Sequence, residues 1–314
     1  MRELADGAEI VNPFRIPRMT PNSYQPLRPW DVAEHLDYYV GVDKTEDAFR
    51  EFELQTRNPE SLVADGRLVV VLGGQGCGKT SLIHRCTASV CGTLRTLKVT
   101  PVIVNLTREG MLNHAIPARM SDVCSGLIDQ LDIDQRLNRS ILEELKSRKD
   151  SPVDVYSYLS KVLQRQANNG DDLVVVVLLP PSDLVEEIIN YARLVRPRLL
   201  FFAESSFVNE HSGWQSRLGS SCVPPIRLAV GILEPDDGFL FADTRLESHR
   251  GDGITPSVSE ATMDELQKKR PALTIGQLQR LLCGVYGELL KQPTPVPEVT
   301  VQHFKDYYFN PGLD

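Results

Sequence analysis

Short apolar runs alternate with amphipathic segments along most of the chain. The apolar runs occupy residues 66–74, 98–107, 173–179, 196–206 and 224–230. Their Val, Leu, Ile and Phe residues follow one another with little polar interruption, which is typical of strands buried on both faces. Apolar residues at helical spacing fill residues 79–90, 121–133, 139–149, 153–167 and 183–195. This alternation predicts an α/β fold, with a parallel sheet covered by helices on both faces.

The two ends of the chain show different patterns. Five prolines fall between Pro13 and Pro29 without any sustained period, which predicts an extended arm. Beyond residue 229 no run is convincing as a strand, and residues 259–269 and 274–292 have the spacing of successive helices. We therefore predict three parts, which are an arm at residues 1–38, an α/β domain at residues 39–229 and a small all-helical domain at residues 230–314.

The stretch GGQGCGKTS lies between the first predicted strand and the helix that follows it. It matches the P-loop (Walker A) pattern G-x-x-x-x-G-K-[ST] at every fixed position, in the strand-before, helix-after context that supports the motif. The glycines let backbone N–H groups converge on phosphate oxygens, and the helix N-terminus adds a positive field. We expect Lys79 to contact the β- and γ-phosphates and Thr80 to ligate Mg²⁺.

The loop therefore predicts nucleotide binding, with ATP or ADP and Mg²⁺ as the cofactors. The candidate cofactor-binding residues of the loop are Gly73, Gly74, Gln75, Gly76, Cys77, Gly78, Lys79, Thr80 and Ser81.

The apolar run at residues 173–179 ends in Pro180 and Pro181. P-loop enzymes carry a magnesium-binding Asp at the end of such a strand, and often a second carboxylate that acts on water. Proline can do neither, so hydrolysis is expected to be weak or absent. Asp183 and Glu204 could still supply a carboxylate. Asp183 also suits the N-cap of the next helix, and we favour that interpretation.

Composition narrows the possible functions. The 314 residues carry a net charge of −8, which gives no global basic field and makes nucleic acid an unexpected partner. The six cysteines form no Cys-x-x-Cys pair and are expected to be reduced thiols. The longest apolar run is too short to span a bilayer, and the N-terminus lacks the pattern of a signal peptide. We expect a cytoplasmic protein without a membrane partner.

The order of these features along the chain resembles that of AAA+ ATPases, especially the branch of origin-recognition-type initiators and related signalling (STAND-like) NTPases. The stretch YYVGVDKTEDAF resembles the "vGRe" turn of that branch, with Val42 where the family has Arg. Residues 212–246 look like its later helix, last strand and entry into the lid, and residues 271–308 like the helical lid itself. The likeness covers residues 39–308.

The resemblance implies roles for individual residues. Val40 and Gly41 would lie near the adenine, and Ser205 or Ser206 would occupy the polar sensor position. Arg217 would be an arginine finger that reaches the γ-phosphate of a neighbouring subunit.

The resemblance also implies a nucleotide-sensing arginine in the lid. Arg280 lies near that position, although the family's usual arginine falls closer to Gln279. The changes at Val42, at the two prolines and at Gln279 all indicate a divergent member with reduced catalysis.

These observations favour a nucleotide-gated assembly or switch module that acts on a protein partner or on further copies of itself. The alternative is an active ATP hydrolase that uses Lys79 and Arg217 together with Asp183, Glu204 or a residue of a neighbouring subunit. An initiator-like DNA binder is the third possibility, and the acidic charge counts against it.

Overall fold

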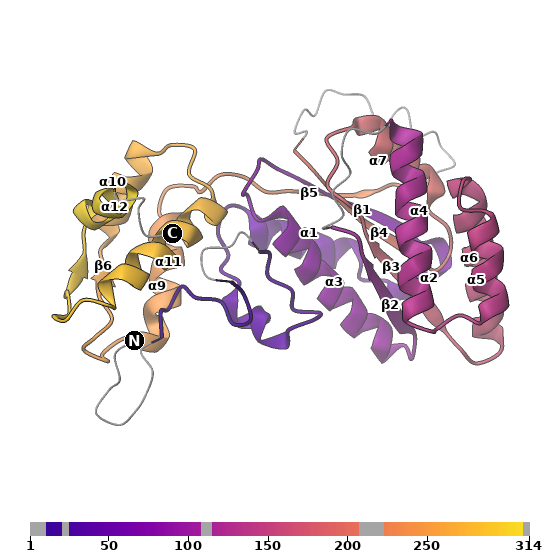
Figure 1. Ribbon diagram of the computed structural model, residues 1–314, viewed down its shortest axis with the longest axis horizontal. Coiled ribbons are helices and arrows are strands. Elements are labelled where there is room, and N and C mark those ends of the chain that lie inside the picture. The colour runs from indigo at the N-terminus through magenta and orange to yellow at the C-terminus, as the bar shows by residue number, and fades with distance from the viewer. Residues whose placement is uncertain (1–10, 21–24, 108–114, 207–222, 310–314) are drawn as a thin grey trace. The chain divides into compact units, whose positions relative to one another are not determined.

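The computed structural model describes residues 11–20, 25–107, 115–206 and 223–309. The chain forms two compact units (Figure 1). The sheet unit consists of residues 48–74 and 79–229, and the helical unit of residues 1–47, 75–78 and 230–314. The helical unit therefore combines the N-terminal segment, the middle of the phosphate loop and the C-terminal helices.

A five-stranded sheet forms the centre of the sheet unit, and its strands lie in the order β2-β3-β4-β1-β5. All neighbouring strands are parallel. The predicted parallel sheet and its five strands are therefore confirmed. The strands are β1 (Arg67–Leu72), β2 (Thr100–Asn105), β3 (Leu173–Leu178), β4 (Leu199–Ser205) and β5 (Ile226–Ala229).

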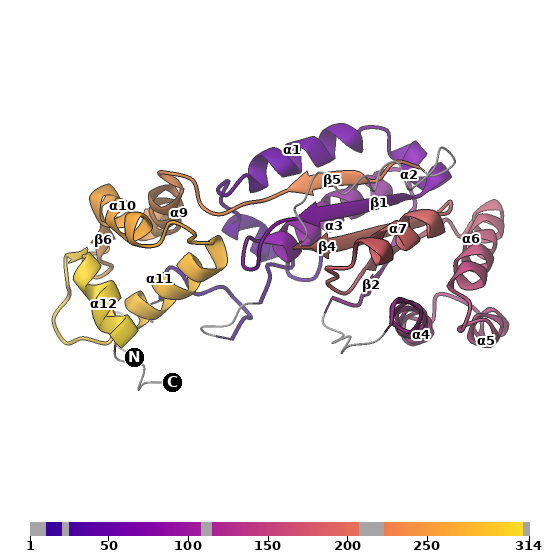
Figure 2. The ribbon, with the colours of Figure 1, turned by 90° about the horizontal axis from the view of Figure 1, so that it is seen from above.

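Helices cover both faces of this sheet (Figure 2). On one face α3 (Lys79–Thr96) packs against the strands, with α1 (Thr45–Gln55) and α2 (Pro59–Asp65) beside it. The other face carries α4 (Ile116–Ile133), α6 (Pro152–Asn168) and α7 (Val185–Leu194), with α5 (Arg139–Ser147) against α4 and α6. The sequence pattern missed α2 and ended α3 too early.

Strand β4 shows why the apolar runs are continuous. Every residue from Leu199 to Ser205 is buried. The ring of Phe201 meets Tyr156 of α6 edge-on at 5.1 Å between centroids, whereas Phe202 faces Phe52 of α1 at 6.2 Å. Because successive side chains point to opposite faces, both faces need apolar residues and no alternation remains in the sequence.

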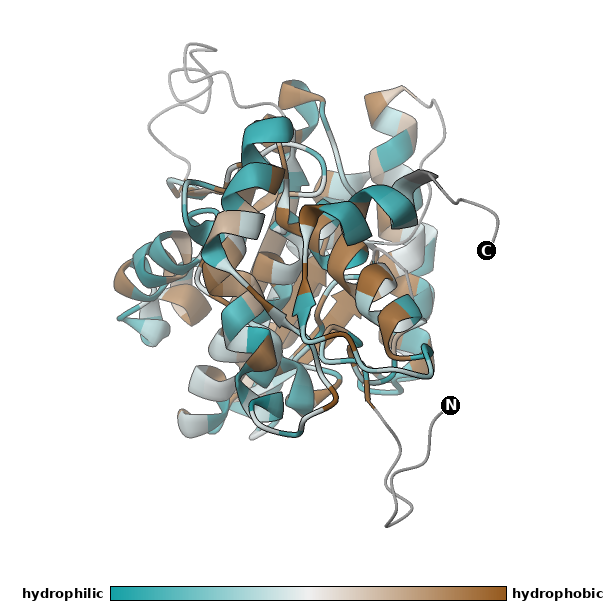
Figure 3. Cartoon of the chain, turned by 90° about the vertical axis from the view of Figure 1, so that its left-hand side faces the viewer, coloured by the Kyte–Doolittle hydropathy of each residue, from teal (hydrophilic) through white to brown (hydrophobic). Residues whose placement is uncertain are grey.

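The helical unit is built mainly from four helices, and Figure 3 shows that they carry both hydrophobic and hydrophilic residues. They are α9 (Asp237–Leu246), α10 (Glu260–Lys269), α11 (Ile275–Leu289) and α12 (Val301–Phe309). The expectation that this part holds no strand was wrong, because β6 (Ser257–Val258) and β7 (Glu298–Val299) pair in parallel. Two-residue strands are too short to leave a pattern in the sequence.

The N-terminal arm packs into this unit. The ring of Phe14 is fully buried and lies 4.8 Å from Tyr286 of α11 and 6.3 Å from Phe241 of α9, centroid to centroid. Arg245 of α9 donates to the carbonyl of Pro13 at 3.1 Å. Within the described parts of the arm, the only helical element is the 3₁₀ helix Ala33–Tyr38. No helix in the described ranges is both long and apolar enough to cross a bilayer.

Candidate functional site

The phosphate loop connects the end of β1 to the start of α3, as the motif predicted. Gly76 and Gly78 have φ angles of 79° and 73°, in the left-handed region that glycine occupies without steric cost. The N–H of Gly73 donates to the carbonyl of Ser205 at 3.1 Å, which fixes the start of the loop to the end of β4.

Lys79 opens α3, and its ammonium group folds back onto the loop. Its Nζ donates to the carbonyl of Gly73 at 2.9 Å and to that of Gly74 at 2.8 Å. These two bonds hold the positive charge beside the turn of the loop, where a phosphate oxygen would be a stronger, charged acceptor.

Thr80 is paired with one of the two carboxylates considered as metal ligands. Its Oγ1 donates to Oε2 of Glu204 at 2.6 Å. Glu204 is 7% exposed and stands in register with Val71 near the end of β4. A hydroxyl and a carboxylate oxygen are ligands that Mg²⁺ accepts, and the ion takes phosphate oxygens and water as the rest. The residues present therefore fit a magnesium ion bound together with a nucleotide.

No cluster of three or more His, Cys, Asp or Glu side chains suited to a metal occurs among the described residues. A magnesium ion that shares the phosphates of a nucleotide does not require such a cluster.

The second candidate carboxylate, Asp183, is engaged elsewhere. Its Oδ1 accepts the N–H of Ser206 at 2.8 Å. The expectation that it caps α7 was wrong, because the cap position belongs to Leu184 and no side chain caps the helix there. The helix starts one residue later than the pattern suggested, so Asp183 lies too early to accept an N–H of its first turn.

A buried ion pair that sequence analysis did not identify follows β3. Arg119 Nε of α4 lies 2.9 Å from Oε2 of Glu187 on α7, and Oγ of Ser182 donates to the same oxygen at 2.5 Å. Arg119 also donates to the carbonyl of Pro181 at 3.2 Å. The segment after the two prolines is thus held by a salt bridge. Arg119 and Glu187 both stand on otherwise apolar helix faces. A charge in such a position is the feature of the sequence that could have indicated a buried ion pair.

The middle of the loop contacts the first turn of α11 within the helical unit. The N–H of Gly276 donates to the carbonyl of Gly76 at 3.0 Å. Thr274 caps α11 by a capping box with Gln277, and a Cβ atom placed on Gly76 would lie 2.6 Å from Thr274 Oγ1. Residue 76 therefore has to be glycine for two reasons, which are the close approach of Thr274 and the left-handed φ angle.

The residues assigned by resemblance lie in several places. Val40 accepts the N–H of Val42 at 2.9 Å in the turn before α1, and Gly41 lies in the same turn. Ser205 is buried and bonds the start of the loop through its carbonyl, as described above. Arg217 lies outside the described residues.

The lid positions lie on α11. Arg280 is in its second turn. The preceding residue, Gln279, donates a hydrogen bond from its side chain to the carbonyl of Phe14. The position of the family's sensing arginine is thus linked to the N-terminal arm.

Asp43 is a buried acid that sequence analysis passed over. It is 1% exposed and has a φ angle of 50°. Burial raises the pKa of its carboxyl from 3.8 to about 8, with hydrogen bonding from Thr45 opposing the rise and the charge of Asp237 reinforcing it. Its position in the turn after Gly41 gave no signal of burial, because the helices that cover it come much later in the chain.

Comparison with known proteins identifies the fold. No protein-family model and no curated protein matches the sequence. The structure resembles ORC2 of Aeropyrum pernix, solved as ADPNP and ADP complexes, with 11% identity, a TM-score of 0.52, and coverage of 86% of this chain and 68% of that chain. It also resembles A. pernix ORC1, solved in complex with DNA, with 14% identity, a TM-score of 0.51, and coverage of 90% and 69%. At this level of identity the likeness concerns the fold. The chain has the α/β fold of AAA+ ATPases and resembles their ORC branch.

Proposed function

We propose that this chain binds a nucleoside triphosphate with Mg²⁺ on its phosphate loop and acts as a nucleotide-gated switch or assembly module. The observation that carries the proposal is the geometry of the loop. Two glycines with left-handed φ angles, a preceding strand, a following helix and a folded-back Lys79 are what binding of a phosphate tail requires.

Thr80 and Glu204 are the residues that would hold the metal ion. When bound, Mg²⁺ neutralises charge on the β- and γ-phosphate oxygens. In the structure the Thr80 hydroxyl donates to Glu204 at 2.6 Å. That hydrogen bond positions the two oxygen ligands side by side before either meets the ion.

Gating needs a part of the molecule whose arrangement depends on the nucleotide, because a ligand shifts an equilibrium only through its different affinity for the two states. The bond from Gly276 to Gly76 at 3.0 Å ties the loop to α11. Gln279 of the same helix holds the carbonyl of Phe14 in the arm. A change in the loop on nucleotide binding would therefore reach the arm through one rigid helix.

Slow turnover follows from the end of β3. Pro180 and Pro181 bring no carboxylate, Asp183 bonds the backbone of Ser206, and Glu187 is neutralised by Arg119. Among the described residues at these strand ends, Glu204 is the remaining acid, and we assign it to the metal. Without a second carboxylate to act on water, general base catalysis loses on the order of 10²–10⁴-fold in rate.

The experiment compares the assembly state of the intact chain with ADP, with ATP and with a non-hydrolysable ATP analogue, all with Mg²⁺. Analytical ultracentrifugation of wild type should show a different sedimentation coefficient with the triphosphates than with ADP, and Lys79→Ala should show no difference. Identical sedimentation coefficients in all three nucleotides would contradict the gating role.

A second candidate function, an active ATP hydrolase, is favoured by one observation, which is the contact between Thr80 and Glu204. If Glu204 acts on water as well as on the metal, phosphate release from ATP should fall by about 10²-fold or more in Glu204→Gln. An Asp183→Asn variant serves as the matched control and should keep its rate. A wild type without measurable phosphate release would exclude this candidate.

DNA binding is the least supported possibility. The A. pernix ORC1 structure contains DNA, but this chain carries a net charge of −8, which opposes binding to a polyanion. A gel-shift assay with duplex DNA at physiological salt is expected to show no complex.

A further inference from the structure

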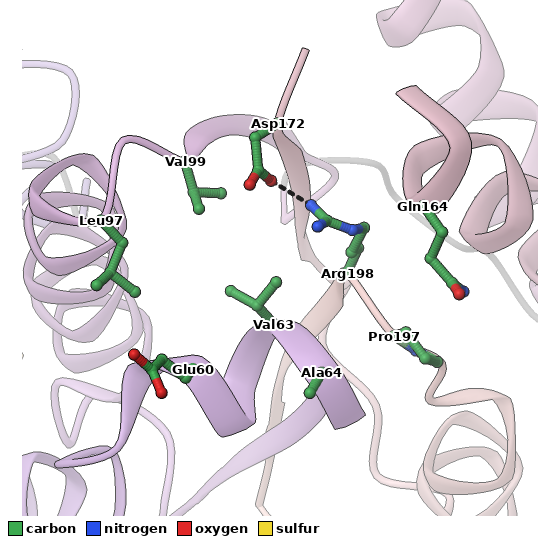
Figure 4. A pocket seen from close by; sticks show the side chains of 9 residues that line it. All are labelled: Glu60, Val63, Ala64, Leu97, Val99, Gln164, Asp172, Pro197 and Arg198. Atoms are coloured by element: carbon green, nitrogen blue, oxygen red, sulfur yellow. Dashed lines mark hydrogen bonds and ion pairs between the residues drawn. The ribbon is translucent and has the colours of Figure 1, made fainter. Parts of the chain in front are cut away.

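A cavity of about 440 Å³ lies in the sheet unit, at the edge of the sheet opposite the phosphate loop (Figure 4). Val99, Asp172 and Arg198 line it, and they are the residues directly before β2, β3 and β4. Because the strands are parallel, their amino ends share one edge, whereas the phosphate loop follows the carboxyl end of β1. Open α/β sheets bind nucleotides at the carboxyl edge, so this cavity is separate from the nucleotide site proposed above.

Apolar side chains form much of the cavity wall. Val63 and Ala64 belong to α2, and Leu97 and Val99 lie between α3 and β2. Val99 is 5% exposed and Leu97 is 37% exposed, so the apolar wall runs from the interior to the surface. Figure 4 shows the side chains of Val63, Leu97 and Val99 around one space. Such a wall suits an alkyl chain, because burial of apolar area is favourable, and the volume is in the range of small-ligand sites.

One end of the cavity holds a complete salt bridge. Nη1 of Arg198 is paired with Oδ1 of Asp172 and also donates to the carbonyl of Leu173 at 3.1 Å. The backbone of Arg198 is fixed as well, because its N–H donates to the carbonyl of Val63 at 2.9 Å and its carbonyl accepts the N–H of Val175 at 3.0 Å. The side chain of Arg198 is 13% exposed. The pair therefore adds no net charge to the cavity, and its guanidinium group is held in place.

Glu60 of α2 brings a second carboxylate, at the other end of the cavity from the salt bridge (Figure 4). Within the described ranges its side chain takes part in no hydrogen bond or ion pair. Two carboxylates and one guanidinium group leave the lining with one net negative charge. Lys98 and Arg196 are neighbours in the chain but do not line the cavity, and Nη1 of Arg196 donates to the carbonyls of Arg193 and Val195, at 2.7 Å each. The charge of Glu60 therefore favours a cationic ligand.

We propose that this cavity binds a primary alkylammonium group, with its alkyl chain on the apolar wall and its ammonium beside Glu60. A free alkylamine and the lysine side chain of a protein partner share this chemistry, since lysine buries its methylene stem and keeps its charged head near water. An anion is disfavoured, because Asp172 already pairs with the guanidinium group and Glu60 would repel it. The cavity shares no residue with the phosphate loop, so the inference goes beyond the proposed function and does not depend on it.

The test compares three probes of equal chain length, n-pentylamine, n-pentanol and pentanoate, on the intact chain at about pH 7, where the amine is protonated. Saturation-transfer NMR titration should show saturable binding of pentylamine with a Kd on the order of 1 mM, as suits so small a ligand. Pentanol should bind about threefold or more weakly, because it lacks the charge, and pentanoate should not saturate. Saturable binding of pentanoate, or equal affinities for pentanol and pentylamine, would overturn the proposal.

Two variants locate the binding. Glu60→Gln should weaken the binding of pentylamine by about threefold or more, whereas Asp65→Asn removes an exposed acid of the same helix outside the cavity and should leave it unchanged. Ala64→Phe fills part of the cavity and should weaken binding by about tenfold or more, as the exclusion of about two methylene groups predicts. Unchanged affinity in both Glu60→Gln and Ala64→Phe would overturn the site. If circular dichroism shows that Ala64→Phe does not fold, Glu60→Gln and its control decide the matter.

Two further titrations separate the source of the ammonium group and the two sites of the chain. The tripeptide acetyl-Gly-Lys-Gly-amide should bind at least as tightly as pentylamine if a protein partner supplies the group, and more weakly if a free amine does; either result supports the site. Pentylamine should also bind in the presence of saturating MgATP, and its displacement by MgATP would overturn the inference. Binding of pentylamine without any binding of nucleotide would contradict the proposed function and leave the cavity site standing.

Discussion

Gly76→Ala is the substitution that most directly perturbs the contact between the phosphate loop and α11. The new Cβ would stand 2.6 Å from Oγ1 of Thr274 and 3.5 Å from its Cβ. The first distance is well inside van der Waals contact, so the cap of α11 has to move. The φ angle of 79° adds a second penalty, because an L side chain in the left-handed region costs about 1–2 kcal/mol.

The two penalties can be separated. Moving Thr274 weakens its hydrogen bond to the N–H of Gln277, and loss of an N-cap costs about 1 kcal/mol. Gly76→Ala should therefore lower the free energy of unfolding by about 2–3 kcal/mol. Gly78→Ala is the matched control, because φ is 73° but the nearest atom to its Cβ lies at 3.5 Å. It should cost only the backbone strain, about 1–2 kcal/mol.

The assay is urea denaturation of wild type, Gly76→Ala, Thr274→Ala and the double variant. Thr274→Ala alone should cost about 1 kcal/mol through the lost cap. In the Thr274→Ala background the Oγ1 atom that the new Cβ of residue 76 would overlap is absent. The double variant should therefore lose about 1 kcal/mol less free energy of unfolding than the sum of the two single variants. Strict additivity, or a Gly76→Ala variant as stable as wild type, would refute the reasoning that the loop and the cap are in direct contact.

Three further predictions follow from buried groups. Phe14→Ala removes a fully buried ring and should lower the free energy of unfolding by about 3–5 kcal/mol in urea denaturation, whereas Ala in place of the exposed Arg15 should change it by less than about 0.5 kcal/mol. Glu187→Gln leaves Arg119 buried without its counter-charge and should cost about 3–5 kcal/mol in the same assay, while replacing both residues with Leu should recover most of that loss. The pKa of Asp43 is raised from 3.8 to about 8, so its stabilising proton is fully present below about pH 3.8 and is lost as the pH rises through about 8. The melting temperature of wild type should fall relative to that of Asp43→Asn over this range, and parallel curves would contradict the raised pKa.

The sheet could be predicted from the sequence because each of its strands is buried on both faces. A continuous apolar run such as Leu173–Leu178 that lies between two helices is assigned as a buried strand of a parallel sheet. The loop of residues 73–80 was equally accessible, since its chemistry lies in one contiguous segment. The short strands β6 and β7 could not be predicted from the sequence. Two residues are too few to show a hydrophobic pattern, and the pairing of such strands depends on the packing around them.

The rest of the candidate site depends on contacts between distant residues. Glu187 meets Arg119, which lies 68 positions away, and no local pattern shows that pairing. Glu204 was a candidate from its place at the end of a predicted strand, but the sequence left it as one of two alternatives, and its bond to Thr80, 124 positions away, appears only in the fold. The favoured role of Asp183 as a helix cap failed for a related reason, because the position of the first turn of α7 was set by tertiary packing and differed by one residue from the pattern.

The central claim is that residues 73–80 bind the phosphates of a nucleotide, and titration calorimetry of MgATP into the intact chain tests it most directly. Wild type should give a saturable heat that corresponds to one nucleotide per chain, and Lys79→Ala should give none, because it lacks the ammonium group held at 2.9 and 2.8 Å from the loop carbonyls. An absence of heat with wild type, or an equal heat with both proteins, would contradict the claim.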